Sequence, residues 1–172
     1  MCLLSSQIKT DETITNIEFE SVANDLLMIS VDYDTNDSSR IFSYWRLLGN
    51  SASPPLEIGI NTDKKTIKSI TFFADTDCFK EANLELLNIL NGNVTVDTDI
   101  FKKENDYVDT EGEYFITISC NNLICVFGLE NHIKQAVGNN RIKFLINNNN
   151  ELCGFEICDL NENEIKAIKS IQ

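Results

Sequence analysis

Basic residues and histidine are scarce in this sequence. Of its 172 residues, 14 are Lys or Arg and 27 are Asp or Glu, so the formal net charge is −13. A protein that binds nucleic acid needs basic patches to neutralise phosphates, so this balance argues against nucleic-acid binding. An acidic surface also disfavours anionic membranes, and it favours either a basic partner or simple solubility.

The sequence also lacks a targeting signal and a long apolar run. Its first residues, MCLLSSQIKTDETI, have no basic region and an apolar run of only three residues, unlike a secretory signal peptide. No stretch approaches the roughly 20 apolar residues of a membrane-spanning helix. We therefore expect a cytoplasmic protein without membrane association.

Motifs of known catalytic sites are absent. There is no Gly-x-Ser-x-Gly elbow, cysteine-protease signature, GxxxxGK[ST] phosphate loop or GxGxxG pattern. His132 is the only histidine, and we interpret it as an ordinary surface residue rather than a catalytic base. The acids from Asp32 resemble a calcium loop, but Asp37 and Ser43 occupy the positions that require Gly and Glu. We therefore predict no cofactor and no metal site.

The cysteines have a simpler interpretation than a zinc site. They are Cys2, Cys78, Cys120, Cys125, Cys153 and Cys158. In a reducing cytosol they should be thiols, and the two C-x4-C pairs lie at the outer limit of zinc-ligand spacing. Within a strand an offset of five places two side chains on opposite faces. We therefore predict core thiols that act as small hydrophobic residues.

Successive hairpins predict the architecture. In RIKFLINNNNELCGFEICDL, Lys143–Ile146 and Leu152–Cys158 have the apolar pattern of strands. Asn147–Asn150 predict a turn between them, because Asn tolerates left-handed backbone angles and hydrogen-bonds its own main chain. The other predicted strands are Thr15–Val22, Leu26–Tyr33, Arg40–Leu47, Leu56–Asn61 and Ile67–Phe73, with a third hairpin over Tyr114–Gly128 that turns at Asn121-Asn122.

Helices are predicted where apolar residues recur at helical spacing. Asn161 and Glu164 form a capping box ahead of one such run, near the end of the sequence. Two further helices are predicted over Cys78–Asn91 and Glu130–Val137, each followed by a glycine that suits a C′ position.

Two parts of the sequence look related, because each contains a strand, a turn, a strand and a helix. Ile58–Asn61 matches Phe144–Asn147, and Ile70–Phe72 matches Phe155–Ile157. We therefore predict a single α+β domain over residues 1–172, which can be divided into weakly repeated halves, 1–92 and 93–172. Its antiparallel β-sheet is built from successive hairpins, with two or three helices packed on it.

The candidate binding residues lie in an acidic segment and in an aromatic cluster. Val96–Glu113 is the least apolar segment, with seven acids and two lysines. In the cluster IFSYWRLL, alternation places Tyr44 and Arg46 on one face and Trp45 on the other. Core packing is the commoner role of such residues, and a binding hot spot is the alternative. The predicted partner-binding residues are Asp97, Asp99, Glu104, Asp106, Tyr107, Asp109, Glu111 and Trp45.

A strongly acidic chain that is rich in Asn and Ile and carries no catalytic motif resembles, in type, bacterial immunity proteins. These belong to polymorphic-toxin and contact-dependent inhibition systems. The resemblance rests on composition and hairpin architecture over the whole chain, and no motif residue is carried over. It implies a cognate toxin domain, commonly a basic nuclease, whose active site is covered by an acidic surface. Electrostatic steering would give the fast capture that this role requires.

Two other classes of function stay open at this point. An enzyme that works through carboxylates predicts several acids with raised pKa values in one concave pocket, whereas a binding protein predicts a flat acidic face. A homo-oligomeric structural or phage protein predicts an exposed apolar patch instead.

Overall fold

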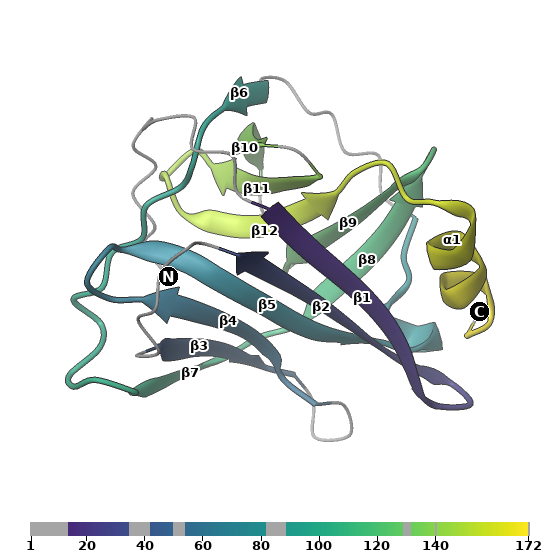
Figure 1. Cartoon of the computed structure of the whole chain (residues 1–172), viewed down its shortest axis with the longest axis horizontal. Coiled ribbons are helices and arrows are strands. Elements are labelled where there is room, and N and C mark those ends of the chain that lie inside the picture. Colours follow the sequence, from purple (N-terminus) through teal and green to yellow (C-terminus); the bar gives the residue numbers. More distant parts are fainter. Residues whose placement is uncertain are drawn as a thin grey trace.

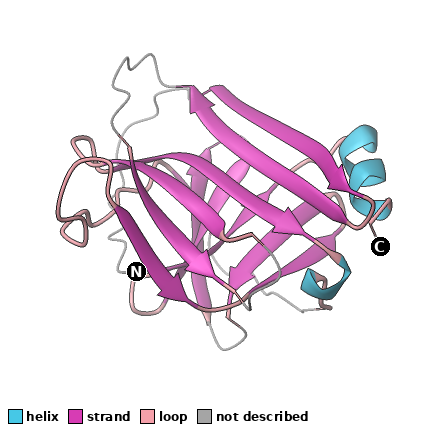
Figure 2. Ribbon diagram, turned by 90° about the horizontal axis from the view of Figure 1, so that it is seen from below, coloured by secondary structure: helices cyan, strands magenta, loops and turns pink. Residues whose placement is uncertain are grey.

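The computed structural model describes residues 14–34, 42–49, 54–81, 89–128, 132–139 and 141–171. Two six-stranded sheets lie face to face, the first in the lower half of Figure 1 and the second in the upper half. In the described part of the chain, the helical elements are one α-helix and one short 3₁₀ turn, and both lie beside the ends of strands (Figure 2).

The first sheet combines a hairpin, a three-stranded meander and one parallel strand. Its strands are β1 (Ile14–Ala23), β2 (Leu26–Asp34), β3 (Ser43–Leu48), β4 (Leu56–Asn61), β5 (Thr66–Ala74) and β7 (Tyr107–Glu111). They lie in the order β1-β2-β5-β4-β3-β7, and only β3 and β7 pair in parallel. Branched and aromatic residues favour the extended backbone of these segments, since their side chains pack well on a pleated surface.

The second sheet is built in the same way. Its strands are β6 (Ile89–Asn91), β8 (Tyr114–Ser119), β9 (Asn122–Phe127), β10 (Ile133–Asn139), β11 (Ile142–Asn147) and β12 (Leu152–Ile157). They lie in the order β6-β10-β11-β12-β9-β8, and only β6 and β10 pair in parallel. The 3₁₀ turn η1 (Thr76–Cys78) follows β5, and α1 (Glu162–Lys169) follows β12.

The two sheets have equivalent strand orders, because β8-β9-β12-β11-β10-β6 corresponds to β1-β2-β5-β4-β3-β7. The β4–β5 hairpin has a bulge between Gly59 and Ile60, and the β11–β12 hairpin has one between Leu145 and Ile146. The segments that match in the sequence therefore occupy equivalent places. β7, which follows residue 92, completes the first sheet, and β6, which precedes residue 92, completes the second. Each sheet thus takes strands from both sides of that residue.

The main core lies between the inner faces of the sheets. Phe72 of β5 meets Phe155 of β12 edge to face, with ring centroids 5.1 Å apart, and Tyr114 of β8 at 6.4 Å. Trp45 of β3 packs on Phe127 of β9 at 5.6 Å. Full burial of one large apolar side chain stabilises a fold by roughly 1.5–3 kcal/mol, so these contacts hold the two sheets together.

The outer faces of the two sheets differ in character. A second apolar cluster, on the outer side of the second sheet, consists of Phe115, Ile124, Val126, Ala136, Leu145 and Cys153. The strands of the second sheet are therefore apolar on both faces, as in sheets that are covered on both sides. The first sheet buries one face only.

The predicted fold class, α+β with an antiparallel sheet and two or three helices packed on it, is wrong. The protein is predominantly β, with two mixed sheets, and its described residues contain one α-helix. The predicted helix over Glu130–Val137 is replaced by β10, which pairs with β11 on one side and β6 on the other. The spacing of apolar residues at positions 133, 136 and 137 fits a helix as well as a strand. Backbone pairing with two neighbouring strands stabilises the strand instead.

The predicted helix over Cys78–Asn91 is not a continuous helix. Cys78 ends η1, Phe79 forms a parallel bridge with Ile116, and Ile89–Asn91 is a strand. Residues 82–88 lie outside the described ranges, as do Arg40 and Ile41 of the predicted strand Arg40–Leu47. Here the ends of the segment pair with opposite edges of the second sheet, and this overrides local helix propensity.

The helix predicted from the capping box is confirmed as α1. The Asn161 side chain accepts hydrogen bonds from the N–H groups of Asn163 and Glu164, and the Glu164 carboxylate accepts one from the Asn161 N–H. The helix has eight residues and buries Ile168 against the core. Among the described residues, no helix has the length and hydrophobicity needed to cross a membrane.

Candidate functional site

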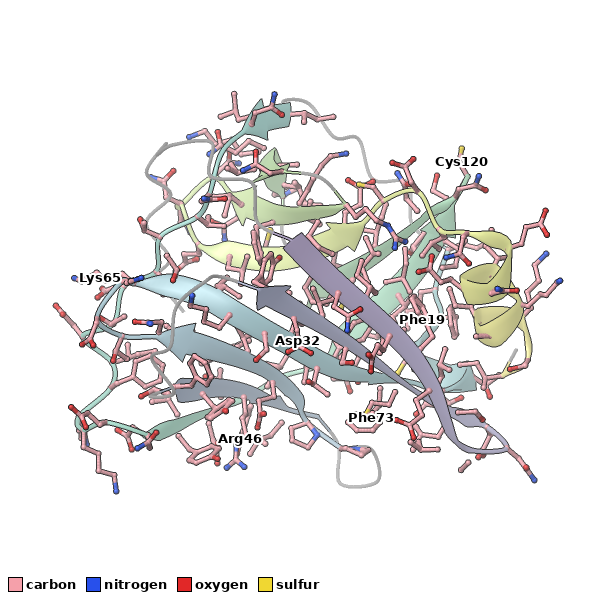
Figure 3. The ribbon with its side chains drawn as sticks, in the orientation of Figure 1. Phe19, Asp32, Arg46, Lys65, Phe73 and Cys120 are labelled. Carbon is pink, nitrogen blue, oxygen red and sulfur yellow. The ribbon has the colours of Figure 1, made fainter. Side chains whose placement is uncertain are left out.

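The outer face of the first sheet points away from the second sheet and is open. In β3, buried and less buried residues alternate, so Tyr44 and Arg46 point outward while Trp45 and Leu47 point into the core. Figure 3 shows Arg46 and Phe73 on this outer side. Figure 2, seen from below, shows no helix of the described residues lying across these strands. On this face the described side chains of β1 and β7 are exposed, and those of β3, β4 and β5 are partly exposed.

Carboxylates dominate this surface, which we call the acidic face. Strand register assigns to it Asn16, Glu18, Glu20, Met28, Ser30, Asp32, Tyr44, Arg46, Leu48, Glu57, Ser69, Thr71, Phe73, Tyr107, Asp109 and Glu111. These residues include six carboxyl groups and one positively charged group, the guanidinium of Arg46. Like charges on one face repel each other, and a basic partner would relieve that repulsion.

A cluster of two tyrosines and an ion pair lies at the β3–β7 edge of the acidic face. Tyr44 and Tyr107 stack with ring centroids 5.1 Å apart, and the Arg46 guanidinium lies 4.8 Å from the centre of the Tyr107 ring. Arg46 donates two hydrogen bonds to Asp109, from Nε at 2.7 Å and from Nη2 at 2.9 Å. Tyr107 is 53% exposed, so the cluster presents an accessible aromatic surface that these contacts hold in place.

Glu57 of β4 faces Arg46 across the strand pair. Burial raises the pKa of the Glu57 carboxyl, and the positive charge of Arg46 opposes this rise. The Tyr44 hydroxyl also has a raised pKa, first because of burial and then because of the Glu57 charge. These shifts indicate that the middle of the acidic face is partly shielded from water even without a partner.

The predicted binding residues separate into three groups. Three lie together on the acidic face, namely Tyr107, Asp109 and Glu111 on β7. Four lie in the turns before that strand, namely Asp97, Asp99, Glu104 and Asp106. Trp45 is only 3% exposed and lies on the opposite side of the first sheet. A role of these eight residues in binding a partner stays a prediction.

Two of the turn acids hold the main chain that leads into β7. Asp97 Oδ1 accepts a hydrogen bond from the Asp99 N–H at 3.0 Å. The Asp106 carboxylate accepts from the N–H groups of Lys102 at 2.8 Å and Tyr107 at 3.1 Å, and the bond from Lys102 is the main reason that the Asp106 pKa is lowered. Replacing either acid would therefore alter the turn as well as the charge.

Sequence reasoning placed Tyr44 and Arg46 in the aromatic cluster but did not include them among the predicted partner-binding residues, and it did not consider Glu57. Alternation separates Tyr44 and Arg46 from Trp45, and this signal is readable in the sequence, but the choice of Trp45 rests on residue type alone. The pairing that brings Asp109 beside Arg46 joins residues 63 positions apart, and no local pattern encodes it.

A small pocket opens where Gly112 and Glu113 connect β7 to β8. Its volume is about 280 Å³, and its lining includes Trp45, Phe127, Leu152, Glu111, Glu113 and Glu151. The indole Nε1–H of Trp45 donates to Thr110 Oγ1 at 2.9 Å, which holds the ring in place. The lining that the structure describes contains carboxylates but no Lys, Arg or His.

The cysteines are spread over the molecule. Among the described cysteines, Cys125, Cys153 and Cys158 are buried, Cys78 is half-buried and Cys120 is exposed. Cys120 lies at the β8–β9 turn (Figure 3), so its prediction as a core thiol is wrong, and Cys2 lies outside the described residues. In the described ranges, no group of three or more His, Cys, Asp or Glu side chains is placed to hold a metal ion.

His132 is exposed just before β10, and it belongs neither to the acidic face nor to the pocket lining.

A scan of the chain against protein-family models found no match. A search of the curated proteins found no similar sequence either. Function is therefore inferred from the acidic face and the pocket.

Proposed function

We propose that this chain is a non-catalytic binding protein that captures a basic protein domain on its acidic face. The observation that carries the proposal is the Tyr44–Tyr107 pair with Arg46, set among six carboxylates on an open sheet. A few Tyr, Trp and Arg residues supply most of the binding energy in protein interfaces. Surrounding charge of one sign steers an oppositely charged partner to them.

The distribution of charged and apolar groups supports a binding protein over the two alternatives. Glu57, a carboxyl group with a raised pKa, lies on the open acidic face and not in the pocket. The exposed large aliphatic side chains among the described residues are Val22, Ile89 and Ile118, which belong to three different strands, β1, β6 and β8. A carboxyl group with a raised pKa on an open face does not identify a reaction centre in a concave pocket, and exposed aliphatic side chains on three separate strands do not identify one apolar patch.

The partner that we propose is a toxin domain with a basic surface, such as a nuclease, and the chain would act as its immunity protein. A nuclease needs positive charge to hold the phosphates of its substrate. An acidic sheet that binds this surface would cover the active site. Rapid, steered association suits an inhibitor that must act before its target does.

Growth protection and direct binding test this proposal together. The product of the open reading frame beside the gene would be expressed with and without this chain, and association would be measured on a biosensor at low and high salt. We expect rescue of growth, and an association rate that falls as salt screens the charges. A neighbouring product that is toxic, but is neither bound nor neutralised, would contradict the immunity role.

Variants of the acidic face identify the surface that binds. Tyr107→Ala should weaken binding by more than about 30-fold, the loss typical of an aromatic hot spot. Asp109→Asn should slow association, with an effect that shrinks at high salt. The matched control is Asp63→Asn, which removes the same charge from the exposed β4–β5 turn, outside the acidic face. Equal losses for Asp109→Asn and Asp63→Asn would mean that net charge, and not this face, governs binding.

A further inference from the structure

β7 is an edge strand of the first sheet, at the lower left of Figure 1, and it pairs with β3 on one side. At one end of this pairing the Tyr44 N–H donates to the carbonyl oxygen of Asp106 at 2.8 Å. At the other end the Gly112 N–H donates to the carbonyl oxygen of Leu48 at 3.1 Å. Main-chain groups of successive strand residues point to opposite sides, so the even-numbered residues of this segment bond to β3.

The odd-numbered residues of β7, which are Tyr107, Asp109 and Glu111, direct their main-chain groups to the other side. The Tyr107 N–H donates to the Asp106 side chain at 3.1 Å. In the described part of the chain, no main-chain hydrogen bond reaches the N–H and C=O groups of Asp109 and Glu111 on this side. Such a row of unpaired groups is a template for one more strand.

The side chains at this edge determine which strand would fit. Asp109 and Glu111 are both exposed, and Glu111 forms no ion pair with any described residue, whereas Asp109 is paired with Arg46. Neighbouring strands place side chains of one face beside each other, where opposite charges attract and like charges destabilise the pairing. Lys or Arg at alternate positions therefore suits this edge, whereas a second copy of β7 would place acid beside acid.

The opposite side of an added strand would lie beside Val108 and Thr110. Both residues are half-buried, and Val108 packs against the core between the sheets. The Thr110 Oγ1 accepts a hydrogen bond from the indole N–H of Trp45 at 2.9 Å, so this side of β7 is fixed in place. β-branched residues pack well on such a pleated, half-buried surface.

The other sheet edges do not combine these features. At the edge of β8, the Lys80 N–H donates to the carbonyl oxygen of Ile116 at 2.9 Å, so that edge is already partly paired. β6 has three residues and offers a short ladder. On the acidic face, β1 presents Asn16, Glu18 and Glu20 and no aromatic ring.

We propose that β7 receives an extended strand of the basic partner, in which Lys or Arg alternates with β-branched residues. The inference rests on the proposed function, since it states how a basic protein docks at the acidic face. Main-chain hydrogen bonds to Asp109 and Glu111 supply affinity, and the exposed side chains of Tyr107, Asp109 and Glu111 select cationic residues.

Amide hydrogen exchange, measured by NMR on the whole chain, tests the pairing with the synthetic peptide acetyl-Lys-Thr-Arg-Val-Lys-Thr-amide. The Asp109 and Glu111 amides should exchange rapidly in the free chain, and at least about 10-fold more slowly with the peptide bound. The Val108 and Thr110 amides, which bond to β3, are internal controls that should be protected in both states. Protection of Asp109 and Glu111 in the free chain would overturn the open edge. No slowing at millimolar peptide would overturn the pairing.

Two N-methylated peptides separate main-chain pairing from simple charge attraction. One carries N-methyl groups on its basic residues and the other on the alternate residues, so both keep the same charge. Since one side of the added strand faces β7, one peptide should lose at least about 10-fold in affinity while the other binds nearly as before. Equal effects of the two methylation patterns would overturn the added strand. Equal binding of a peptide with Glu in place of Lys and Arg would overturn the choice of a basic strand.

Charge-removing variants locate the peptide on the sheet. Glu111→Gln should weaken the peptide about 2–5-fold, as expected for one exposed charge pair. The matched control, Glu20→Gln, removes an equal charge from β1 at the opposite edge of the same sheet and should change the affinity much less. Equal losses in the two variants would mean that net charge, and not β7, holds the peptide. Dimers of the chain alone in sedimentation, with Asp109 and Glu111 protected, would make a second copy the occupant and overturn the proposal.

The same amides separate failure of this inference from failure of the proposed function. If a basic protein binds and depends on Tyr107 while the Asp109 and Glu111 amides stay unprotected, the inference about the edge is wrong and the proposed function stands. If the peptide pairs with β7 but no basic protein domain binds the acidic face, the proposed function fails. In that case β7 is confirmed as a site for an extended basic peptide rather than for a folded toxin domain.

Discussion

Replacing Glu164 with Ala tests how α1 is attached to the second sheet. The Glu164 carboxylate accepts a hydrogen bond from the Asn161 N–H at 2.8 Å, which completes the capping box. Arg141 donates to both carboxylate oxygens, at 3.1 Å and 2.7 Å. Arg141 also donates to the carbonyl oxygens of Cys158 at 3.1 Å and Asp159 at 3.3 Å. Glu164 thus orients a side chain that joins the helix to the end of β12.

The expected loss follows from these contacts. The side chains of Glu164 and Arg141 are 10% and 32% exposed, so the ion pair is partly shielded from water. Loss of a helix-capping interaction costs about 0.5–2 kcal/mol, and loss of hydrogen bonds between charged groups costs about 1.5–3 kcal/mol. Because Arg141 can regain water contacts, we expect a total of roughly 2–4 kcal/mol, or about 4–16 °C in Tm for a chain of this size.

Urea denaturation, followed by Trp45 fluorescence and circular dichroism, measures this loss. The matched control is Glu162→Ala, because Glu162 is exposed in the same first turn and loses only its favourable interaction with the helix dipole, about 0.3–1 kcal/mol. Arg141→Ala should cost less in the Glu164→Ala background than in the wild-type protein, as expected for coupled partners. If Glu164→Ala and Glu162→Ala differ by less than about 0.5 kcal/mol, the reasoning is refuted.

Three further predictions concern a glycine, a thiol and the histidine. Gly154 has a φ of 156°, and an added Cβ would collide with the carbonyl oxygen of Cys125. Gly154→Ala should therefore cost more than about 2 kcal/mol in urea denaturation, whereas Gly49→Ala, whose Cβ would make only an ordinary van der Waals contact, should cost far less. Burial raises the pKa of the Cys78 thiol from 9.0 to about 11, so stability from this group is complete below pH 9 and falls as the pH rises towards 11. In the Cys78→Ala variant, the Tm measured in thermal melts should decrease less between pH 9 and pH 11. If the decrease is unchanged, groups other than Cys78 cause it. His132→Gln should leave partner binding and Tm unchanged, and loss of binding by a folded variant would reopen the enzyme hypothesis.

Hairpins and the capped helix could be read from the sequence because their signals are local. The prediction of Leu56–Asn61 as a strand is confirmed with the same bounds. The asparagine turn works as expected, since Asn147 Oδ1 accepts from the N–H groups of Asn149 and Glu151, both at 2.9 Å. The capping box likewise joins residues three positions apart. In each case the hydrogen-bonded residues are only a few positions apart in the sequence, so the residue types alone determine the geometry.

The wrongly predicted helix over Glu130–Val137 shows that local sequence signals do not determine every element. Apolar residues in Glu130–Val137 have a spacing that suits a helix, yet Ile133–Asn139 is a strand between β6 and β11. Two ladders of hydrogen bonds and burial in both apolar clusters outweigh a preference of a few tenths of a kcal/mol per residue. The sequence contains the apolar positions of this strand but not the identity of its neighbours.

The sequence by itself determined the hairpins, the N-cap of α1, the strong negative charge and the separation of Tyr44 and Arg46 from Trp45. Only the tertiary structure decided that β7 pairs in parallel with β3, which places Tyr107 and Asp109 beside Tyr44 and Arg46. It also decided that Trp45 is buried and borders a pocket with Glu111. The physical reason is range: turns and caps depend on neighbours in the chain, whereas the acidic face depends on which distant strands the shared core brings together.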